Sequence, residues 1–296
     1  MRLSETRIPE IDSKLTPAFS IVIPTLNQGR YIGQTIGSIV GQCWPGTEII
    51  VIDGGSTDGT AEVVKRFGNA ITHFLSEPDR GQADAINKGM GLAHGEFLAW
   101  LNSDDYYLPD IFGRAAKLLE NGRELRVLHG STIAWFEERK ETCLWRSQPS
   151  AQEALKTRAA IYQPSAFWTR SVWEKTGLLN LNYHYVLDWD WFLRASAYAQ
   201  FIRLDDPLSV YRFHGAHKTG SGNPRRAEEI CAFVERSGGP EWGAAFREVA
   251  ERLNEIGPQL DRLKRLGLWR FRKWFYPGLY GRHGEKVKVA LSQLRH

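Results

Sequence analysis

Side chains able to do chemistry gather where the apolar runs of the first 105 residues end. The four run ends are Pro24–Asn27, Asp53–Ser56, Ser76–Asp79 and Asn102–Asp105. Three of them carry carboxylates, and in an open α/β sheet such ends meet at one edge. Negative charges gathered there are costly unless a cation or hydrogen-bond donors compensate them. The simplest compensation is a divalent metal held by hard oxygen ligands, so the sequence predicts a metal site at this edge.

Glycine motifs that cradle phosphates are absent after these runs. No G-x-G-x-x-G and no G-x-x-x-x-G-K-[ST] follows a predicted strand, which argues against dinucleotide and P-loop chemistry. A nucleotidyltransferase also uses an α/β sheet with acidic metal ligands. That class would carry a glycine- and lysine-rich loop after the first strand, and residues 25–30, Thr-Leu-Asn-Gln-Gly-Arg, match it poorly.

The elements that position these ends alternate between strand and helix. Apolar runs at 19–27 and 47–60 predict strands, and isoleucines at helical spacing predict a helix over 31–42 between them. The alternation continues with helices at 60–67, 82–93 and 108–120 and strands at 70–76, 95–105 and 127–131. Strand–helix–strand units with short connections predict parallel strands joined by right-handed crossovers, hence an α/β fold.

Seven ordered segments resemble the family 2 glycosyltransferases of the GT-A fold. They are Pro24–Asn27, Asp53–Thr60, Gly81–Gly89, Leu101–Asp105, Gln163–Trp168, Asp188–Arg194 and Tyr211–His214. Because they occur in order over most of the chain, they are more specific together than singly. The resemblance implies a Rossmann-like, mostly parallel central sheet flanked by helices. It also implies transfer of a sugar from a nucleotide-sugar to an acceptor hydroxyl, with inversion at the anomeric carbon.

The resemblance assigns donor-binding roles to residues of this sequence. The loop Pro24, Thr25, Leu26 and Asn27 would line the base and ribose, and Asp53 would accept a hydrogen bond from the base. Four further residues would contact the nucleotide-sugar, namely Gln82, Asp84, Asn102 and Ser103. The sequence departs from the family at Leu26, where many members have an aromatic residue beside the base.

The resemblance also implies a site for Mn²⁺ or Mg²⁺. Asp104 matches the last acid of the D-x-D metal motif and would hold the cation against the diphosphate. His214 lies in a segment that closes over the diphosphate and is the second expected ligand, with Asp105 as a further candidate. Asn102 replaces the first acid of the motif, which leaves a neutral and weaker ligand there. The alternatives are an exposed acidic turn at residues 104–105 and a packed or surface histidine at 214.

A carboxylate in a later segment is the predicted general base. An acceptor hydroxyl is a poor nucleophile and needs a base to take its proton as the bond forms. Asp188 matches the acid of the family's catalytic-base motif, and Asp190 is the second candidate. The amphipathic residues that follow predict a helix start, on which the two side chains diverge by roughly 200°. Only one can point into the site; the other can interact with the helix dipole.

The length and composition of the chain limit the class of protein it can be. The chain has 296 residues, 42% of them hydrophobic, and a net charge of +4. This excludes wholesale disorder and gives no indication of a nucleic-acid partner. We expect a polar leader at 1–17, a catalytic domain at 18–222 whose nucleotide-binding half is 18–105 and acceptor-binding half 106–222, and a helical C-terminal extension at 223–296 that is basic and aromatic.

The C-terminal residues and the cysteines bear on location. From Arg262 onward the chain has ten basic residues and one acid, Glu285, interleaved with Trp, Phe and Tyr. This pattern fits a segment that lies in the headgroup region of an anionic membrane, or a helix that packs its aromatic side chains on the domain. Three scattered cysteines, no signal peptide and no long apolar run predict a cytoplasmic protein, peripheral at the inner face of the plasma membrane if the segment binds lipid.

The sequence therefore predicts an inverting, metal-dependent glycosyltransferase of the hexosyltransferase class. Its donor would be a UDP- or GDP-sugar, and its acceptor a saccharide or a lipid-linked molecule used in cell-surface polysaccharide or glycolipid synthesis. Two other classes stay open. A nucleotide-sugar-binding protein without catalysis would explain Asn102 but not Asp188, and a nucleotidyltransferase would explain the acidic sheet edge but not the missing loop.

Overall fold

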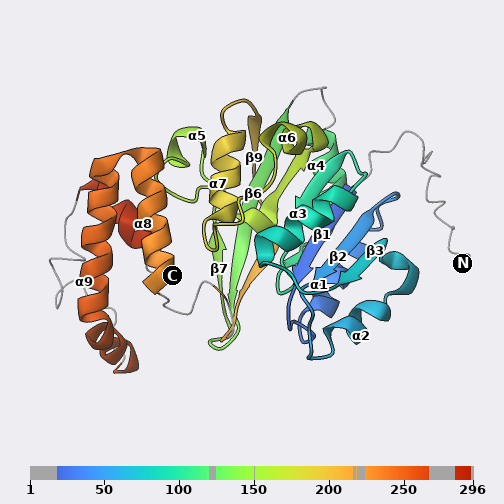
Figure 1. The fold of residues 1–296 in the computed structure, drawn as a ribbon, viewed down its shortest axis with the longest axis horizontal. Coiled ribbons are helices and arrows are strands. Elements are labelled where there is room, and N and C mark those ends of the chain that lie inside the picture. Colours follow the sequence, from blue (N-terminus) through green and yellow to red (C-terminus); the bar gives the residue numbers. More distant parts are fainter. Residues whose placement is uncertain are drawn as a thin grey trace, which may run out of the picture.

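The structure is a computed structural model that describes residues 19–119, 125–149, 151–215, 218, 224–266 and 284–294. In these ranges the chain forms one large mixed sheet with helices on both faces and further helices at its C-terminal end (Figure 1). The order of the strands is β3-β2-β1-β4-β8-β6-β9-β5, with β7 paired to β6. The predicted α/β fold with a helical C-terminal extension is confirmed.

The first half of the sheet is parallel. Its elements are β1 (Phe19–Thr25), α1 (Ile32–Val40), β2 (Glu48–Asp53), α2 (Thr60–Lys65), a 3₁₀ turn η1 (Gly68–Ala70), β3 (His73–Ser76), α3 (Gln82–Leu92) and β4 (Phe97–Trp100). Strand β1 is buried along its whole length. Ile21 and Ile23 pack on the side of α1, while Val22 packs on the side of α3. Since successive strand residues face opposite sides, this alternation covers both faces and leaves the strand ends for ligands.

Helix α3 lies unusually close to β1. A Cβ atom built on Gly89 would come within 2.4 Å of a methyl carbon of Val22. Only glycine allows this approach, which holds the N-terminal end of α3 near the carboxyl ends of β1 and β4.

The second half of the sheet mixes parallel and antiparallel pairs. Its elements are β5 (Tyr106–Tyr107), α4 (Ile111–Leu119), β6 (Arg126–Phe136), β7 (Glu141–Trp145), α5 (Ala151–Ala154), η2 (Gln163–Ser165), β8 (Ala166–Thr169), α6 (Arg170–Thr176), α7 (Leu187–Ala195) and β9 (Gln200–Phe213). Strand β8 joins the halves, because it runs antiparallel to both β4 and β6. The long pair β6–β9 is parallel and carries an irregular register near Gly130.

In the described C-terminal ranges, 224–266 and 284–294, three helices pack beside this second half, far from β3 (Figure 1). They are α8 (Pro224–Gly238), α9 (Pro240–Arg265) and α12 (Glu285–Leu294). Phe233 of α8 packs on Trp189 of α7 with ring centroids 4.8 Å apart, which joins α8 to the core. Of the helices in the described ranges, none combines the length and apolar character needed to cross a membrane. The leader at 1–17 and residues 267–283, the centre of the basic aromatic segment, lie outside the described residues.

Candidate active site

A first cavity of about 430 Å³ opens at the carboxyl ends of β1 and β4. The donor-site residues predicted from the sequence that line it are Pro24, Thr25, Leu26, Gln82, Asn102, Ser103 and Asp104. Asp188, the predicted base, lies on the same wall although it is more than eighty residues away in the chain. The topology of the sheet therefore brings most of the predicted residues to one place.

Three predicted residues brace the walls of this cavity instead of lining it. Asp53 is fully buried, and its carboxylate accepts hydrogen bonds from the Ser56 amide at 3.1 Å and the Ser76 hydroxyl at 2.7 Å. Asn27 has a positive φ of 53°, and its Oδ1 accepts from the Thr57 amide at 2.9 Å. Asp84 forms ion pairs with Arg80 and Lys88. These contacts fix the loops; direct contacts of these residues with a nucleotide stay predictions.

Asp104 lines the first cavity, and His214, which does not line it, forms a close pair with Asp104. The Oδ2 of Asp104 and the Nε2 of His214 lie 3.1 Å apart. The His214 ring packs on Tyr31, with centroids 4.5 Å apart, which holds the imidazole against the carboxylate. No cluster of three or more metal-ligating His, Cys, Asp or Glu side chains occurs in the described part of the chain. The carboxylate of Asp104 is a ligand of the kind that Mg²⁺ and Mn²⁺ prefer, and phosphate and water commonly complete the shell of Mg²⁺. The role of His214 as a second ligand stays a prediction.

Asp105 points away from that pair. It is fully buried, and its Oδ1 accepts from the Arg212 amide at 2.9 Å. Burial and the neighbouring Asp104 charge raise the pKa of Asp105 well above its ordinary value. The Arg212 side chain also donates from Nε to the main-chain oxygen of Asp104 at 2.9 Å. Arg212 therefore fixes the acidic turn from both sides, and the sequence analysis gave it no role although it lies in the segment Tyr211–His214.

Asn102, which replaces the first acid of the metal motif, takes part in a series of hydrogen bonds. The Oδ1 of Asn102 accepts from Nε2 of Gln82 at 2.7 Å, and the Oε1 of Gln82 accepts from Nζ of Lys218 at 2.9 Å. Lys218 lines the cavity, and burial lowers its pKa to about 8. Lys218 was not predicted, because no local pattern in the sequence connects it with Gln82.

A second cavity, of about 440 Å³, adjoins the first. The residues that line both are Asn102, Gln163, Tyr185, Asp188 and Tyr211. Further aromatic side chains line only the second, among them Trp145, Tyr162 and Phe213. Trp145 lies 5.6 Å from Tyr162 and 5.4 Å from Phe213 between ring centroids. These rings form an aromatic wall beside the candidate base.

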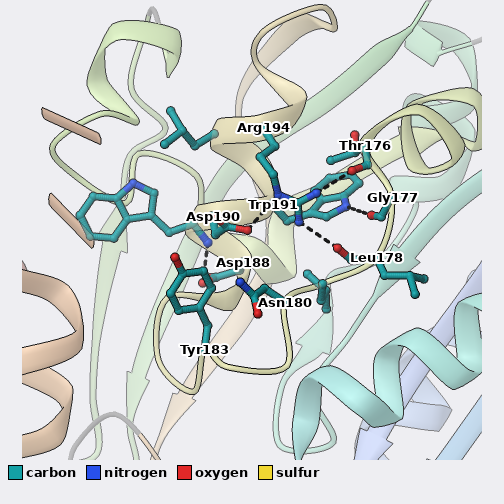
Figure 2. Close-up of polar contacts among 12 residues, drawn as sticks. Thr176, Gly177, Leu178, Asn180, Tyr183, Asp188, Asp190, Trp191 and Arg194 are labelled. Atoms are coloured by element: carbon teal, nitrogen blue, oxygen red, sulfur yellow. Dashed lines mark hydrogen bonds and ion pairs between the residues drawn. The ribbon is translucent and has the colours of Figure 1, made fainter. Parts of the chain in front are cut away.

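Asp188 and Asp190 have different surroundings at the start of α7 (Figure 2). Asp188 lines both cavities, and its Oδ1 accepts from the Trp189 amide at 2.8 Å. Burial raises the pKa of its carboxyl, and the Trp189 amide and the Lys218 charge act in the opposite direction. Asp190 instead accepts from Nε of Arg194 at 2.9 Å.

Arg194 in turn fastens the loop before α7. It donates to the main-chain oxygens of Thr176 at 2.5 Å and Leu178 at 2.9 Å (Figure 2). Asp190 is thus tied to this loop through Arg194, while Asp188 faces the two cavities. The expected divergence of the two carboxylates on a helix accounts for the difference.

Comparisons with known proteins point to one family. The family model described as "Glycosyl transferase family 2" matches residues 20–170, just over half of the chain. A PGL/p-HBAD biosynthesis glycosyltransferase of Mycobacterium tuberculosis is 31% identical over 182 residues, which cover 60% of this chain and 69% of that protein. The chondroitin synthase of Pasteurella multocida is 25% identical over 227 residues, 73% of this chain and 24% of the synthase.

Solved structures share the fold. The mannosyltransferase PcManGT from Pyrobaculum calidifontis, in complex with GDP-Man and Mn²⁺, matches with a TM-score of 0.60 at 18% identity and covers 96% of this chain and 88% of its own. Residues 1–349 of TarS from S. aureus, in complex with UDP-GlcNAc, match with a TM-score of 0.58 at 18% identity over 74% of this chain and 67% of that one.

Proposed function

Because the chain belongs to glycosyl transferase family 2 and is a glycosyltransferase, we propose that it transfers a sugar from a UDP- or GDP-sugar to an acceptor hydroxyl with inversion. One observation carries the proposal. Asp188 lies on the wall shared by two cavities, one built from strand-end loops and the other from aromatic side chains. A base at such a junction can take the proton of an acceptor hydroxyl from one cavity while the hydroxyl oxygen meets the anomeric carbon of a donor in the other.

The donor would occupy the first cavity. Asp104 and His214 would hold Mn²⁺ or Mg²⁺ there, and the bound cation would stabilise the negative charge that develops on the leaving diphosphate. The ammonium of Lys218 adds a positive charge in the same cavity. The complexes of PcManGT with GDP-Man and Mn²⁺ and of TarS with UDP-GlcNAc support a donor of this chemical class.

Asp188 would act on the acceptor. Its carboxylate takes the proton of the acceptor hydroxyl as the hydroxyl oxygen bonds to the anomeric carbon. The bond from that carbon to the diphosphate oxygen breaks on the opposite face, so the configuration inverts and a nucleoside diphosphate leaves. Burial raises the pKa of Asp188, which makes its carboxylate a stronger base than an exposed one.

Nucleotide-sugar binding tests this proposal directly. We expect UDP-glucose, UDP-GlcNAc, UDP-galactose or GDP-mannose, screened with Mn²⁺, to raise the melting temperature, because a ligand that binds the folded state stabilises it. EDTA should remove the shift reversibly, and Asp104→Ala should abolish it. The active donor should also be hydrolysed slowly without acceptor, which separates an enzyme from a binding protein. If no donor of the panel stabilises the protein and none is hydrolysed, the proposed function is wrong.

We also propose that the product belongs to a cell-surface polysaccharide or glycolipid and that the protein acts at the cytoplasmic membrane surface. The names of the mycobacterial relative and of the chondroitin synthase support products of these kinds. The membrane role rests on the basic and aromatic residues after Arg262. The test is co-sedimentation with vesicles of anionic lipid. The triple variant Arg270→Gln, Arg272→Gln, Lys273→Gln should lose binding, and equal recovery of the variant and the wild type would contradict the membrane role.

A further inference from the structure

The second cavity contains two arginines that the transfer reaction itself does not need. Arg158, from the segment after α5, and Arg226, from α8, both line it. Within the described part of the chain neither guanidinium forms an ion pair with a carboxylate. In each side chain the Nε is buried and has no hydrogen-bond partner among the described residues. The cavity therefore holds two positive charges, and the one carboxylate among the described residues that line it, that of Asp188, forms no ion pair with either arginine.

Contacts with α12 fix the Arg226 side chain and the backbone beside Arg158. Arg226 donates to the main-chain oxygen of Gln293 at 2.9 Å and, at 3.5 Å, to that of Leu294. The amide of Ala159, the residue after Arg158, donates to the side-chain oxygen of Gln293 at 3.0 Å. Burial also lowers the pKa of Arg226, which shows that its charge is partly withdrawn from water. Arg226 is therefore held in place with its charge partly buried, and Arg158 is half-buried beside it in the lining of the same cavity.

The same cavity also has a wall that suits a ring. Trp145, Tyr162 and Phe213 pack against one another there, and rings of this kind offer flat apolar faces with little loss of side-chain freedom. The cavity volume of about 440 Å³ lies within the range of small-molecule sites, roughly 300–1,000 Å³. A neutral ring would fill the cavity, but it would remove two guanidinium groups from water without balancing their positive charge. Burying an unbalanced charge costs free energy.

We propose that the second cavity binds an acceptor that carries an anionic group, a carboxylate or a phosphate, beside the ring that stacks on the aromatic wall. Arg158 and Arg226 recognise the anion, because guanidinium groups match the oxygen geometry of carboxylates and phosphates. The hydroxyl that reacts lies toward Asp188, where the second cavity meets the first. The inference rests on the proposed function only in identifying this ligand as the acceptor.

The test compares three probes that differ in charge. They are p-nitrophenyl β-glucoside, p-nitrophenyl β-glucuronide and the 6-phosphate of the glucoside. Binding to the full-length protein is measured without donor, by quenching of tryptophan fluorescence and by calorimetry. We expect at least one anionic probe to bind roughly tenfold to a hundredfold more tightly than the glucoside, since hydrogen bonds to charged groups are strong. The tighter of the two anionic probes identifies carboxylate or phosphate as the preferred group.

Two variants test whether Arg158 causes the preference for anionic probes. Arg158→Gln should bring the anionic probes to the affinity of the neutral one. Arg146→Gln removes the same charge from an exposed residue next to Trp145 that does not line the cavity, and it should keep the preference. Equal binding of all three probes to the wild type, no binding of either anionic probe at millimolar concentration, or an unchanged preference in Arg158→Gln would each overturn the proposal. Because no donor is present, these outcomes are independent of the nucleotide-sugar screen.

Discussion

The two cavities that meet at Asp188 are built in different ways. The first is made mainly from the loops that follow β1 and β4 and from the start of α3, and polar side chains dominate the part contributed by these loops. The second draws on β7, η2, α7, β9, α8 and α12, and aromatic rings and arginines dominate it. The first cavity thus depends on neighbouring parallel strands, while the second depends on segments far apart in the chain.

This contrast explains how proteins of one fold can keep the same donor chemistry and still differ in their acceptors. Strand ends of a parallel sheet put carboxylates at one edge wherever the sheet forms, so the donor chemistry follows from the topology. The second cavity is closed by helices that pack against the sheet through a few contacts, such as Phe233 on Trp189 and Gln293 on Ala159. Substitutions on those helices can reshape the acceptor site without disturbing the sheet.

The sharpest test of this comparison is the pair of carboxylates on α7. Asp188→Asn should lower kcat by on the order of 10²–10⁴, because the amide cannot take the acceptor proton. Nucleoside diphosphate binding should stay unchanged, since Asp188 acts on the acceptor. Asp190→Asn should keep kcat close to that of the wild type and lower the unfolding free energy by about 1–2 kcal/mol, because it weakens the contact with Arg194.

Kinetics with the active donor, combined with urea unfolding of both variants, separate these effects. An inactive Asp190→Asn together with an active Asp188→Asn would reverse the assignment. Loss of nucleotide binding in Asp188→Asn would contradict the division of labour between the two cavities.

The same contrast explains what the sequence could predict. Alternating strands and helices over residues 19–105 follow from short-range periodicity, and the structure has each of them. The strands expected at 47–60 and 95–105 are shorter than predicted, because they end at Asp53 and Trp100 and the polar residues beyond form loops. The separation of Asp188 from Asp190 followed from helical geometry alone. No comparable sequence pattern predicted the second cavity. Trp145, Arg226 and Gln293 follow no regular spacing in the sequence and come together only through packing.

Several individual roles also escaped the sequence. An aspartate that lines a site and one that braces its loop look alike in a motif, so the inward-turned carboxylates of Asp53 and Asp105 were not foreseen. Lys218 and Arg212 each lie close to His214 in the chain, but their contacts with Gln82 and Asp104 join segments more than a hundred residues apart. Such pairings depend on the fold and leave no local pattern.

Acid should weaken the packing of a buried histidine close to the second cavity. His129 of β6 is buried, and its Nδ1 lies 2.8 Å from the hydroxyl of Ser147, just after the strand that carries Trp145. Burial lowers the pKa of His129 to about 4. Between about pH 6.5 and 4 the unfolded chain therefore binds a proton that the folded chain does not, so stability falls as the pH falls through this window.

The loss should reach at most about 3 kcal/mol at the acid end. Chemical denaturation at several pH values measures it, and His129→Gln, which cannot titrate, should flatten the curve over this range. A pH dependence that is identical in His129→Gln would remove His129 as its source.

The smallest effect concerns the charge in the first cavity. Burial lowers the pKa of Lys218 to about 8, so its ammonium loses its proton as the pH rises through that value. If this charge helps to hold the diphosphate, kcat/KM for the donor should fall by roughly tenfold on the alkaline side.

Lys218→Arg stays charged over this range and should keep its activity above pH 8. Lys218→Gln should be uniformly slow, with no alkaline limb. Rate profiles from pH 6 to 10 at saturating acceptor distinguish these cases, and an alkaline limb near pH 8 that persists in Lys218→Gln would assign the titration to another group.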